Sequence, residues 1–311
     1  MPFEIKILGA GSASPLYNRH PSAQFLKINQ KHHFLIDCGE GTQFQLIRYK
    51  IPIHKISHIF ISHLHGDHYF GVMGLISTMH LLGREKPLTI IAPPGLSEIV
   101  TTQTRISESI FNYSLNIIEC NTETYFRILE FEDIEVYTIP LAHRIKCCGY
   151  LFREKPKKRR LINARLPENI TLLQRAALRN GEDIKDEAGN ILHKNEDLTL
   201  PPKKSFSYAY CTDTAYTESI VPYLQNIDLL YHEATFLNAH LQRATDTYHS
   251  TAEQAAIIAS KANAGALLIG HFSSRYKDLE PFLEEACKIF PNTQLAKEGD
   301  WHILKEEHEH I

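Results

Sequence analysis

Four side chains of the kind that bind metal ions fall within six consecutive residues, His63-Leu64-His65-Gly66-Asp67-His68. The run follows an apolar segment typical of a strand and precedes an apolar segment typical of a helix. Neither a strand nor a helix can turn all four side chains to one face, whereas a tight loop at Gly66 can bring them together. The run therefore predicts a metal site in a strand–loop–helix unit, and the fold must supply its remaining ligands.

Three histidines and an aspartate are too many for one tetrahedral site that keeps an open position, so the run favours two adjacent metal ions. Further candidate ligands follow three other apolar segments: His143, Asp213 and His271. Asp213 is the natural bridge, because a carboxylate can give one oxygen to each metal. Ligands gathered at the same ends of several strands are typical of α/β sheets.

The rest of the chain alternates short apolar runs with turn residues and helical patterns, which predicts the α/β fold class. The expected strands are Glu4–Leu8, Ala23–Ile28, His33–Asp37, His58–Ser62, Leu88–Ala92, Ile134–Pro140, Tyr208–Thr212, Asp228–Glu233 and Ala266–Gly270. The expected helices are Thr42–Tyr49, Tyr69–Leu82, Gly95–Ser109, Ile170–Asn180, Thr251–Ala262 and Leu279–Ile289.

The composition is that of a globular protein without a membrane segment. The chain has 311 residues, 43% of them hydrophobic and 22% charged, and a formal charge of −3. No apolar run approaches the roughly 20 residues needed to span a bilayer. Its six cysteines show no CxxC spacing, and the N-terminus does not read as an export signal, so we expect reduced thiols in a cytoplasmic protein. The 18 histidines are unusually many and again favour metal binding.

One stretch departs from this pattern. Seven basic residues and one acidic residue lie between Arg153 and Arg165, and an amphipathic helix and an acidic, hairpin-like segment follow. The whole of Glu154–Lys204 has the character of an excursion between two core strands. An acidic body with one basic limb favours an acidic partner, whereas a lone charge run is more often a solvated loop, and both interpretations stay open from the residues alone.

Several of these segments together resemble a known family. The HLHGDH run matches the HxHxDH signature of the metallo-β-lactamase superfamily. In chain order, the segments FLIDCGEGTQ, YHEAT, HST and GHFSSRY narrow the likeness to the ribonuclease Z (tRNase Z) family in its short form. The likeness runs from Ile7 to about Asp300, which is nearly the whole chain.

The resemblance implies a four-layer αβ/βα sandwich, with residues 1–311 as one domain, Glu154–Lys204 as an inserted flexible arm, and a homodimer. It implies two zinc ions, although sites of this ligand type also accept manganese or other first-row metals. Asp213 would bridge the two ions, and Asp67 would also act as general base. The resemblance places the other ligands on two sites, His63, His65 and His143 on one and Asp67, His68 and His271 on the other.

The residues around the candidate ligands predict further roles. His249, just before a helix N-terminus, is the candidate proton donor, and Glu233 is the expected neighbour that raises its pKa. Arg275 would reach a bound phosphate, with hydroxyls from Ser273 and Ser274, or would instead form a salt bridge within its loop. Arg19 falls in the loop that contacts substrate in this family. Asp37, at a strand end, is expected to orient a ligating imidazole.

Together these features predict a zinc-dependent endoribonuclease that removes the 3′ trailer from precursor tRNA. It would leave a 3′-hydroxyl on the tRNA and a 5′-phosphate on the trailer. One alternative is another hydrolase of the same fold, such as a small-molecule phosphodiesterase, thioesterase or lactonase, which would have no use for a distant basic limb. Another alternative is an RNA-binding protein whose metal ions are structural. Two features argue against it, because the candidate ligands are more than one closed site needs and because Glu233 is expected to pair with His249.

Overall fold

The computed structural model describes residues 2–14, 16 and 19–306. The chain forms two compact units. The first consists of Met1–Glu130, Val136–Phe152 and Ser207–Lys305, and the second of Phe131–Glu135, Arg153–Phe206 and Glu306–Ile311. The second unit thus contains the whole predicted excursion, although the assignment of Glu154–Lys204 as an arm within one domain stays a prediction.

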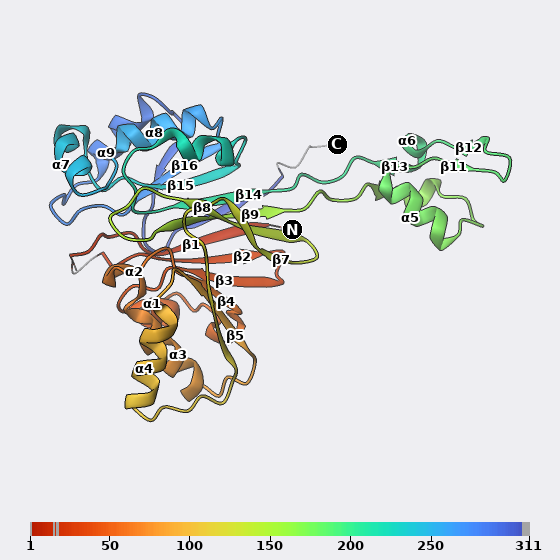
Figure 1. Cartoon of the computed structure of the whole chain (residues 1–311). Helices are drawn as coiled ribbons and strands as arrows, with labels where there is room; N and C mark the ends of the chain where they lie inside the picture. The colour runs from red at the N-terminus through yellow and green to blue at the C-terminus, as the bar shows by residue number, and fades with distance from the viewer. Residues whose placement is uncertain (1, 15, 17–18, 307–311) are drawn as a thin grey trace. The chain divides into compact units, whose positions relative to one another are not determined.

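One sheet of the first unit has the strand order β18-β1-β2-β3-β4-β5-β6, antiparallel from β18 to β3 and parallel from β3 to β6. Its strands are β1 (Phe3–Gly9), β2 (Ala23–Ile28), β3 (His32–Ile36), β4 (His58–Phe60), β5 (Leu88–Ala92), β6 (Leu115–Glu119) and β18 (Trp301–Leu304). The helices beside it are α1 (Thr42–Arg48), α2 (Gly66–Tyr69), α3 (Gly71–Leu81) and α4 (Leu96–Ile106), and a 3₁₀ turn is η1 (Ile53–Lys55). Helices α1, α3 and α4 lie beside this sheet (Figure 1). Their apolar side chains, such as Leu46, Leu75 and Leu96, pack with those of the sheet in one core.

The other sheet has the order β17-β16-β15-β14-β9-β8-β7, and β14 to β17 run parallel. Its strands are β7 (Phe126–Glu130), β8 (Ile134–Pro140), β9 (Cys148–Glu154), β14 (Ser207–Cys211), β15 (Leu229–Glu233), β16 (Ala266–Gly270) and β17 (Thr293–Leu295). The helices that follow its strands are α7 (Leu241–Asp246), α8 (Ala252–Lys261) and α9 (Glu280–Cys287), with 3₁₀ segments η3 (Glu218–Leu224) and η4 (Asn238–His240). A second core joins α8 and α9 to this sheet through residues such as Ile258 and Phe282.

Aromatic side chains fill the space between the two sheets. The Phe60 ring of β4 lies 5.0 Å from the Phe152 ring and 5.2 Å from the Tyr150 ring of β9, centre to centre. The Tyr210 hydroxyl of β14 donates to Asp37, which follows β3. Two sheets in contact, each with helices on its outer face, make a four-layer sandwich, so the predicted α/β fold is confirmed.

The elements depart from the sequence prediction in two ways. The expected helix Tyr69–Leu82 is two helices, and the first, α2, already begins at Gly66, so Asp67 and His68 lie in a helical turn rather than a loop. That turn closes because the Phe70 amide donates to the Gly66 carbonyl at 3.0 Å. In the two large sheets, the strands β6, β7, β9, β17 and β18 were not predicted, and neither was the helix α7. No helix in the described part of the chain is long and apolar enough to cross a membrane.

The second unit is small and has its own core. It pairs β10 (Arg160–Leu161) with β13 (Thr199–Leu200) and β11 (Ile184–Lys185) with β12 (Ile191–His193), and it carries η2 (Asn163–Arg165), α5 (Leu172–Asn180) and α6 (Asn195–Leu198). Leu178, Ile184 and Leu198 are buried together. By contrast, Leu172 and Leu173 are 86% and 83% exposed, so the apolar side predicted for this helix is mostly not buried.

Candidate active site

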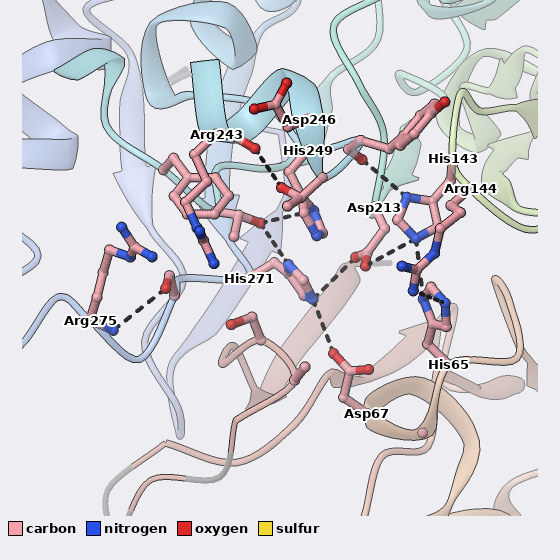
Figure 2. Close-up of a pocket in the computed structure, with 18 residues that line it drawn as sticks. His65, Asp67, His143, Arg144, Asp213, Arg243, Asp246, His249, His271 and Arg275 are labelled. Carbon is pink, nitrogen blue, oxygen red and sulfur yellow. Dashed lines mark hydrogen bonds and ion pairs between the residues drawn. The ribbon is translucent and has the colours of Figure 1, made fainter. Parts of the chain in front are cut away.

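The candidate metal ligands meet at the carboxyl ends of strands from both sheets. His63 lies three residues after β4, Asp213 two residues after β14, and His271 directly after β16. The rest come from the segment after β8 and from the His63–His68 run itself: His65, Asp67, His68 and His143. Figure 2 shows His65, Asp67, His143, Asp213 and His271 around one pocket.

One group joins His63, His65, His143 and Asp213. His63 Nε2 lies 3.0 Å from His65 Nδ1, which in turn lies 3.2 Å from His143 Nε2. Asp213 Oδ2 lies 3.5 Å from His63 Nε2 and 3.9 Å from His143 Nε2. Burial lowers the pKa of His63 well below its usual value, which favours a neutral imidazole with a free lone pair.

A second group joins Asp67, His68 and His271, and a third, of Asp213, His249 and His271, shares one residue with each of the first two. Asp67 Oδ2 lies 3.4 Å from His68 Nε2 and 3.3 Å from His271 Nε2. Asp213 Oδ1, the second oxygen of that carboxylate, lies 3.3 Å from His68 Nε2 and 3.1 Å from His271 Nε2. Asp213 therefore faces both groups, one oxygen to each, which is the arrangement expected of a bridging carboxylate.

Most of the clustered imidazoles have a fixed partner for the nitrogen that faces away from the cluster. Such a partner accepts the ring N–H and thereby leaves the inward nitrogen with its lone pair. The outward contacts are His68 Nδ1 to Asp37 Oδ2 at 2.7 Å, His271 Nδ1 to Thr235 Oγ1 at 2.8 Å, His143 Nδ1 to the Tyr248 carbonyl at 3.0 Å and His63 Nδ1 to Ser62 Oγ at 3.0 Å. The contact predicted for Asp37 is confirmed.

Negative charge is concentrated in this region. Asp37, Asp213 and Glu233 are buried, and the side chain of Asp67 is 7% exposed. No lysine or arginine among the residues that the structure describes forms an ion pair with any of the four. Burial alone would lower the pKa of His68, but Asp213, Asp67 and Asp37 raise it well above its usual value. Buried carboxylates need compensating positive charge, so the site attracts cations.

Backbone strain accompanies the cluster. Asp37, Tyr248 and His271 all have positive φ, at 55°, 58° and 62°. This left-handed conformation is unfavourable for side chains other than glycine and is characteristic of functional sites. At Tyr248 it accompanies the contact of the backbone carbonyl with His143, and at His271 it places the imidazole at the end of β16.

The predicted neighbours Glu233 and His249 are in contact, with His249 Nδ1 2.8 Å from Glu233 Oε1. Burial alone would lower the pKa of His249, but the charges of Glu233 and Asp213 raise it to about 9. Thr251 and Gln254 form the capping box that begins α8, two residues after His249. Ser250 Oγ, between His249 and Thr251, donates to the Thr214 carbonyl.

A pocket of about 460 Å³ opens over the cluster. Asp67, His249 and His271 line it, and of the predicted substrate residues Arg275 and Ser273 do so as well. Two others do not. Ser274 is absent from the lining, and the Arg19 guanidinium donates to the Tyr276 carbonyl outside the pocket.

Several residues that line the pocket were not singled out from the sequence: Ser12, Ala13, Arg144, Thr235, Phe236, Arg243, Asp246, Thr247 and Tyr248. Three of them belong to, or lie next to, residues and segments that were singled out. Arg144 follows His143, Tyr248 precedes His249, and Thr235 ends the YHEAT segment. Arg243, on α7, carries no such signal.

The fold and the site together define the class. A two-sheet sandwich with a histidine–aspartate cluster at its strand ends is a metallo-β-lactamase fold. Human tRNase Z, short form, matches with a TM-score of 0.69 and 25% identity over 96% of this chain and 98% of that one. YhfI from Bacillus subtilis, described as a metallo-β-lactamase fold protein, matches with a TM-score of 0.68 and 19% identity over 97% of this chain and 99% of that one, and shows the fold alone.

The family follows from closer relatives. A family model described as anti-Pycsar protein Apyc1 matches residues 3–155. Ribonuclease Z of Cytophaga hutchinsonii is 50% identical over 310 residues, 100% of this chain and 99% of that protein. Ribonuclease Z of Bacteroides fragilis is 44% identical over 298 residues, 96% of this chain and 97% of that protein. The chain belongs to the ribonuclease Z family, as the sequence motifs predicted.

Proposed function

We propose that the chain is a metal-dependent endoribonuclease that removes the 3′ trailer from precursor tRNA. Cleavage after the discriminator nucleotide leaves a 3′-hydroxyl on the tRNA and a 5′-phosphate on the trailer. The observation that carries this proposal is the whole-length similarity to proteins named ribonuclease Z, combined with a complete candidate site in this chain.

The donor set fits two first-row metal ions, which we take to be zinc, with manganese or another such metal as a substitute. The inward-facing imidazole nitrogens lie only 3.0–3.3 Å apart. The buried carboxylates beside them have no lysine or arginine partner in the described chain, so cations between these groups would stabilise the cluster. One ion would be held by His63, His65 and His143, the other by Asp67, His68 and His271, and both by Asp213. Such a pair neutralises charge on a phosphate and activates water.

Two side chains of the protein would carry out the two proton transfers. Asp67 lines the pocket and would accept the proton of the attacking water. His249 would donate a proton to the ribose 3′-oxygen that leaves. Glu233 holds His249 through Nδ1, which directs Nε2 to the pocket, and the raised pKa keeps that proton bound at neutral pH.

Other groups would hold the substrate near the cut. The Arg275 guanidinium lies 5.2 Å from the centre of the Phe236 ring, a cation–π contact that keeps it at the pocket wall. There it would bind a phosphate, with Ser273 as a hydroxyl donor. Arg19 and Ser274 would act less directly, Arg19 through its hydrogen bond to Tyr276, next to Arg275.

We assign the inserted arm, Glu154–Lys204, to the tRNA body. Its six basic residues between Lys155 and Arg165, together with Arg153 just before the arm, suit a phosphate backbone. The exposed Leu172 and Leu173 beside Arg175 add apolar surface next to positive charge. A small-molecule hydrolase of the same fold, the alternative function, would not need this limb.

We further propose that the protein acts in the cytoplasm as a homodimer. Its cysteines Cys38, Cys120, Cys147, Cys148, Cys211 and Cys287 are all free thiols, as in a reducing compartment. For the dimer, the support is a set of exposed apolar side chains on the helices of the first sheet: Phe44, Ile47, Leu81, Leu82 and Ile106.

The test compares two substrates and one variant. Purified protein should cut a precursor tRNA at one position and leave the stated ends, which sequencing of the products and phosphatase sensitivity of the trailer reveal. Metal content should be close to two ions per chain, and Asp213→Ala should lose both metal and activity. Hydrolysis of bis-p-nitrophenyl phosphate without any cleavage of precursor tRNA would instead support the small-molecule alternative.

A further inference from the structure

Three arginines line the pocket without a carboxylate partner in the described chain: Arg144, Arg243 and Arg275. Guanidinium groups usually pair with a carboxylate or a phosphate, because their fixed fork of donors matches both. Asp246 also lines the pocket, but its Oδ1 accepts from Gln242 Nε2 at 2.9 Å rather than from Arg243. The three side chains are therefore available to an anionic ligand.

Arg144 in particular has no carboxylate beside it among the described residues. Its Nη2 lies 3.3 Å from His65 Nε2, the ring nitrogen that faces away from the cluster. His65 Nδ1 faces His63 and His143 instead. One contact with an imidazole leaves the other donors of the Arg144 guanidinium free for an anion in the pocket.

The arginines lie on opposite sides of the cluster. Figure 2 shows Arg243 and Arg275 on one side of His271, and Arg144 on the other side, beside His65. A substrate with a single phosphate over the cluster would leave at least one side without a negative charge. A phosphodiester inside a strand has a neighbouring phosphate in each direction, which matches positive charge on both sides.

We propose that Arg144 and Arg243 are two phosphate subsites, which bind the phosphates that flank the scissile one on a single RNA strand. The inference rests on the proposed endoribonuclease function and deepens it. It explains how the pocket favours an internal bond over a small phosphodiester, since only a strand offers charge to both arginines at once.

The test removes either the charge of one flanking phosphate or one of the two arginines at a time. Precursor tRNA is prepared with one methylphosphonate, an uncharged linkage, either just upstream or just downstream of the scissile phosphate. For the wild type, each substitution should lower kcat/KM about 10-fold or more, the usual worth of a charged hydrogen bond. Arg144→Ala should be insensitive to one of the two positions, and Arg243→Ala to the other.

A matched control is Arg127→Ala, because Arg127 is paired with Glu130 outside the pocket and should keep both sensitivities. As a second readout, each pocket variant should reduce the slope of log kcat/KM against log salt by about 0.7. The inference is overturned if both variants stay sensitive to both positions, or if both lose the same one. If the wild type does not cut the unmodified precursor, both the proposed function and the two subsites are refuted. If the wild type cuts the precursor but the two arginine variants show neither of the expected insensitivities, only the subsites are refuted.

Discussion

At the scale of single residues, Glu233 connects the candidate proton donor with one of the candidate metal ligands. Its Oε1 accepts from His249 Nδ1, and its Oε2 accepts from the Thr235 hydroxyl at 2.7 Å. The Thr235 oxygen in turn lies 2.8 Å from His271 Nδ1. One buried carboxylate thus fixes both the candidate proton donor and, through Thr235, a candidate metal ligand.

Removal of the proton donor should reveal its role through the leaving group. We expect His249→Ala to lower kcat on precursor tRNA by roughly 10²- to 10⁴-fold with unchanged metal content, because general acid catalysis contributes about that much. On bis-p-nitrophenyl phosphate, whose leaving group needs no proton, the loss should be much smaller. Equal losses on the two substrates would exclude proton donation by His249.

The pH dependence of kcat should shift when the charge on Glu233 is removed. His249 must be protonated to donate, so activity falls as the pH rises through its pKa. Glu233 raises that pKa, to about 9 in the structure. Glu233→Gln should therefore lower the pKa of His249 and move the alkaline limb of the kcat profile to lower pH. A limb that stays in place would show that another group controls it.

The hydroxyl group of Thr235 should contribute more to metal binding than the volume of its side chain does. Thr235→Val keeps the volume but removes the partner of His271 Nδ1, so we expect metal affinity to fall about 10- to 100-fold, as for similar outer contacts. Thr235→Ser keeps the hydroxyl and should retain metal nearly as the wild type does. The measurement is metal content after graded dialysis against a chelator. Equal retention in the two variants would contradict this role.

The residues differ in how far the sequence could predict them. Histidines and aspartates next to strand ends carry a signal because few structural roles need them there, and the predicted set does come together. Thr235, Tyr248 and Arg243 belong to common residue types. Their places depend on the left-handed turn at Tyr248 and on the position of α7, which only the three-dimensional structure reveals.

At the scale of elements, prediction succeeded for most buried strands, but it missed β9, which is buried along nearly all of its length. The parallel strands β14, β15 and β16 are almost fully buried and mostly apolar, which makes them recognisable in the sequence. By contrast, β6, β7 and β18 lie at sheet edges and are largely exposed, so their patterns are weak. The turn that places Asp67 begins at Gly66, and no periodicity over so few residues distinguishes it from a loop.

The arm is an element that can be removed as a unit. Its two ends are paired, because the Glu154 amide donates to the Phe206 carbonyl at 2.9 Å, and the arm has a core of its own. Replacement of residues 155–204 by a short Gly/Ser linker should therefore preserve metal content and hydrolysis of a small phosphodiester.

Cleavage of precursor tRNA by the same variant should collapse through weaker binding, seen as a raised KM and a lost salt dependence. Arm contacts with phosphates should read the shape of the folded tRNA rather than its sequence. If the variant binds and cuts precursor tRNA normally, the arm is only a solvated insertion.

At the scale of the whole molecule, the exposed apolar side chains of α1, α3 and α4 remain to be covered. They lie on the helices of one sheet, and two of the largest, Leu81 and Ile106, are 82% and 70% exposed. Isolated apolar residues are normal on a surface, but several on neighbouring helices mark an interaction site. A second copy of the chain is the partner that we propose.

Charges placed on these helices should separate the copies. We expect the double variant Leu81→Glu with Ile106→Glu to be monomeric, because burial of two uncompensated carboxylates in an interface is unfavourable. Light scattering after gel filtration gives the mass directly. Leu172→Glu, an equally exposed leucine of α5, is the control and should leave the mass unchanged. A monomeric wild type, or a dimeric double variant, would refute this interface.

The order of the ligands along the chain has a consequence for biosynthesis. The first of them is His63 and the last is His271, and the two sheets contribute jointly. A nascent chain that has left the ribosome as far as α7 displays the histidine-rich run but lacks the strand that carries His271. Domains fold as units during synthesis, so the complete site, and with it any ability to cut RNA, arises only after His271 and the strand before it have been synthesised.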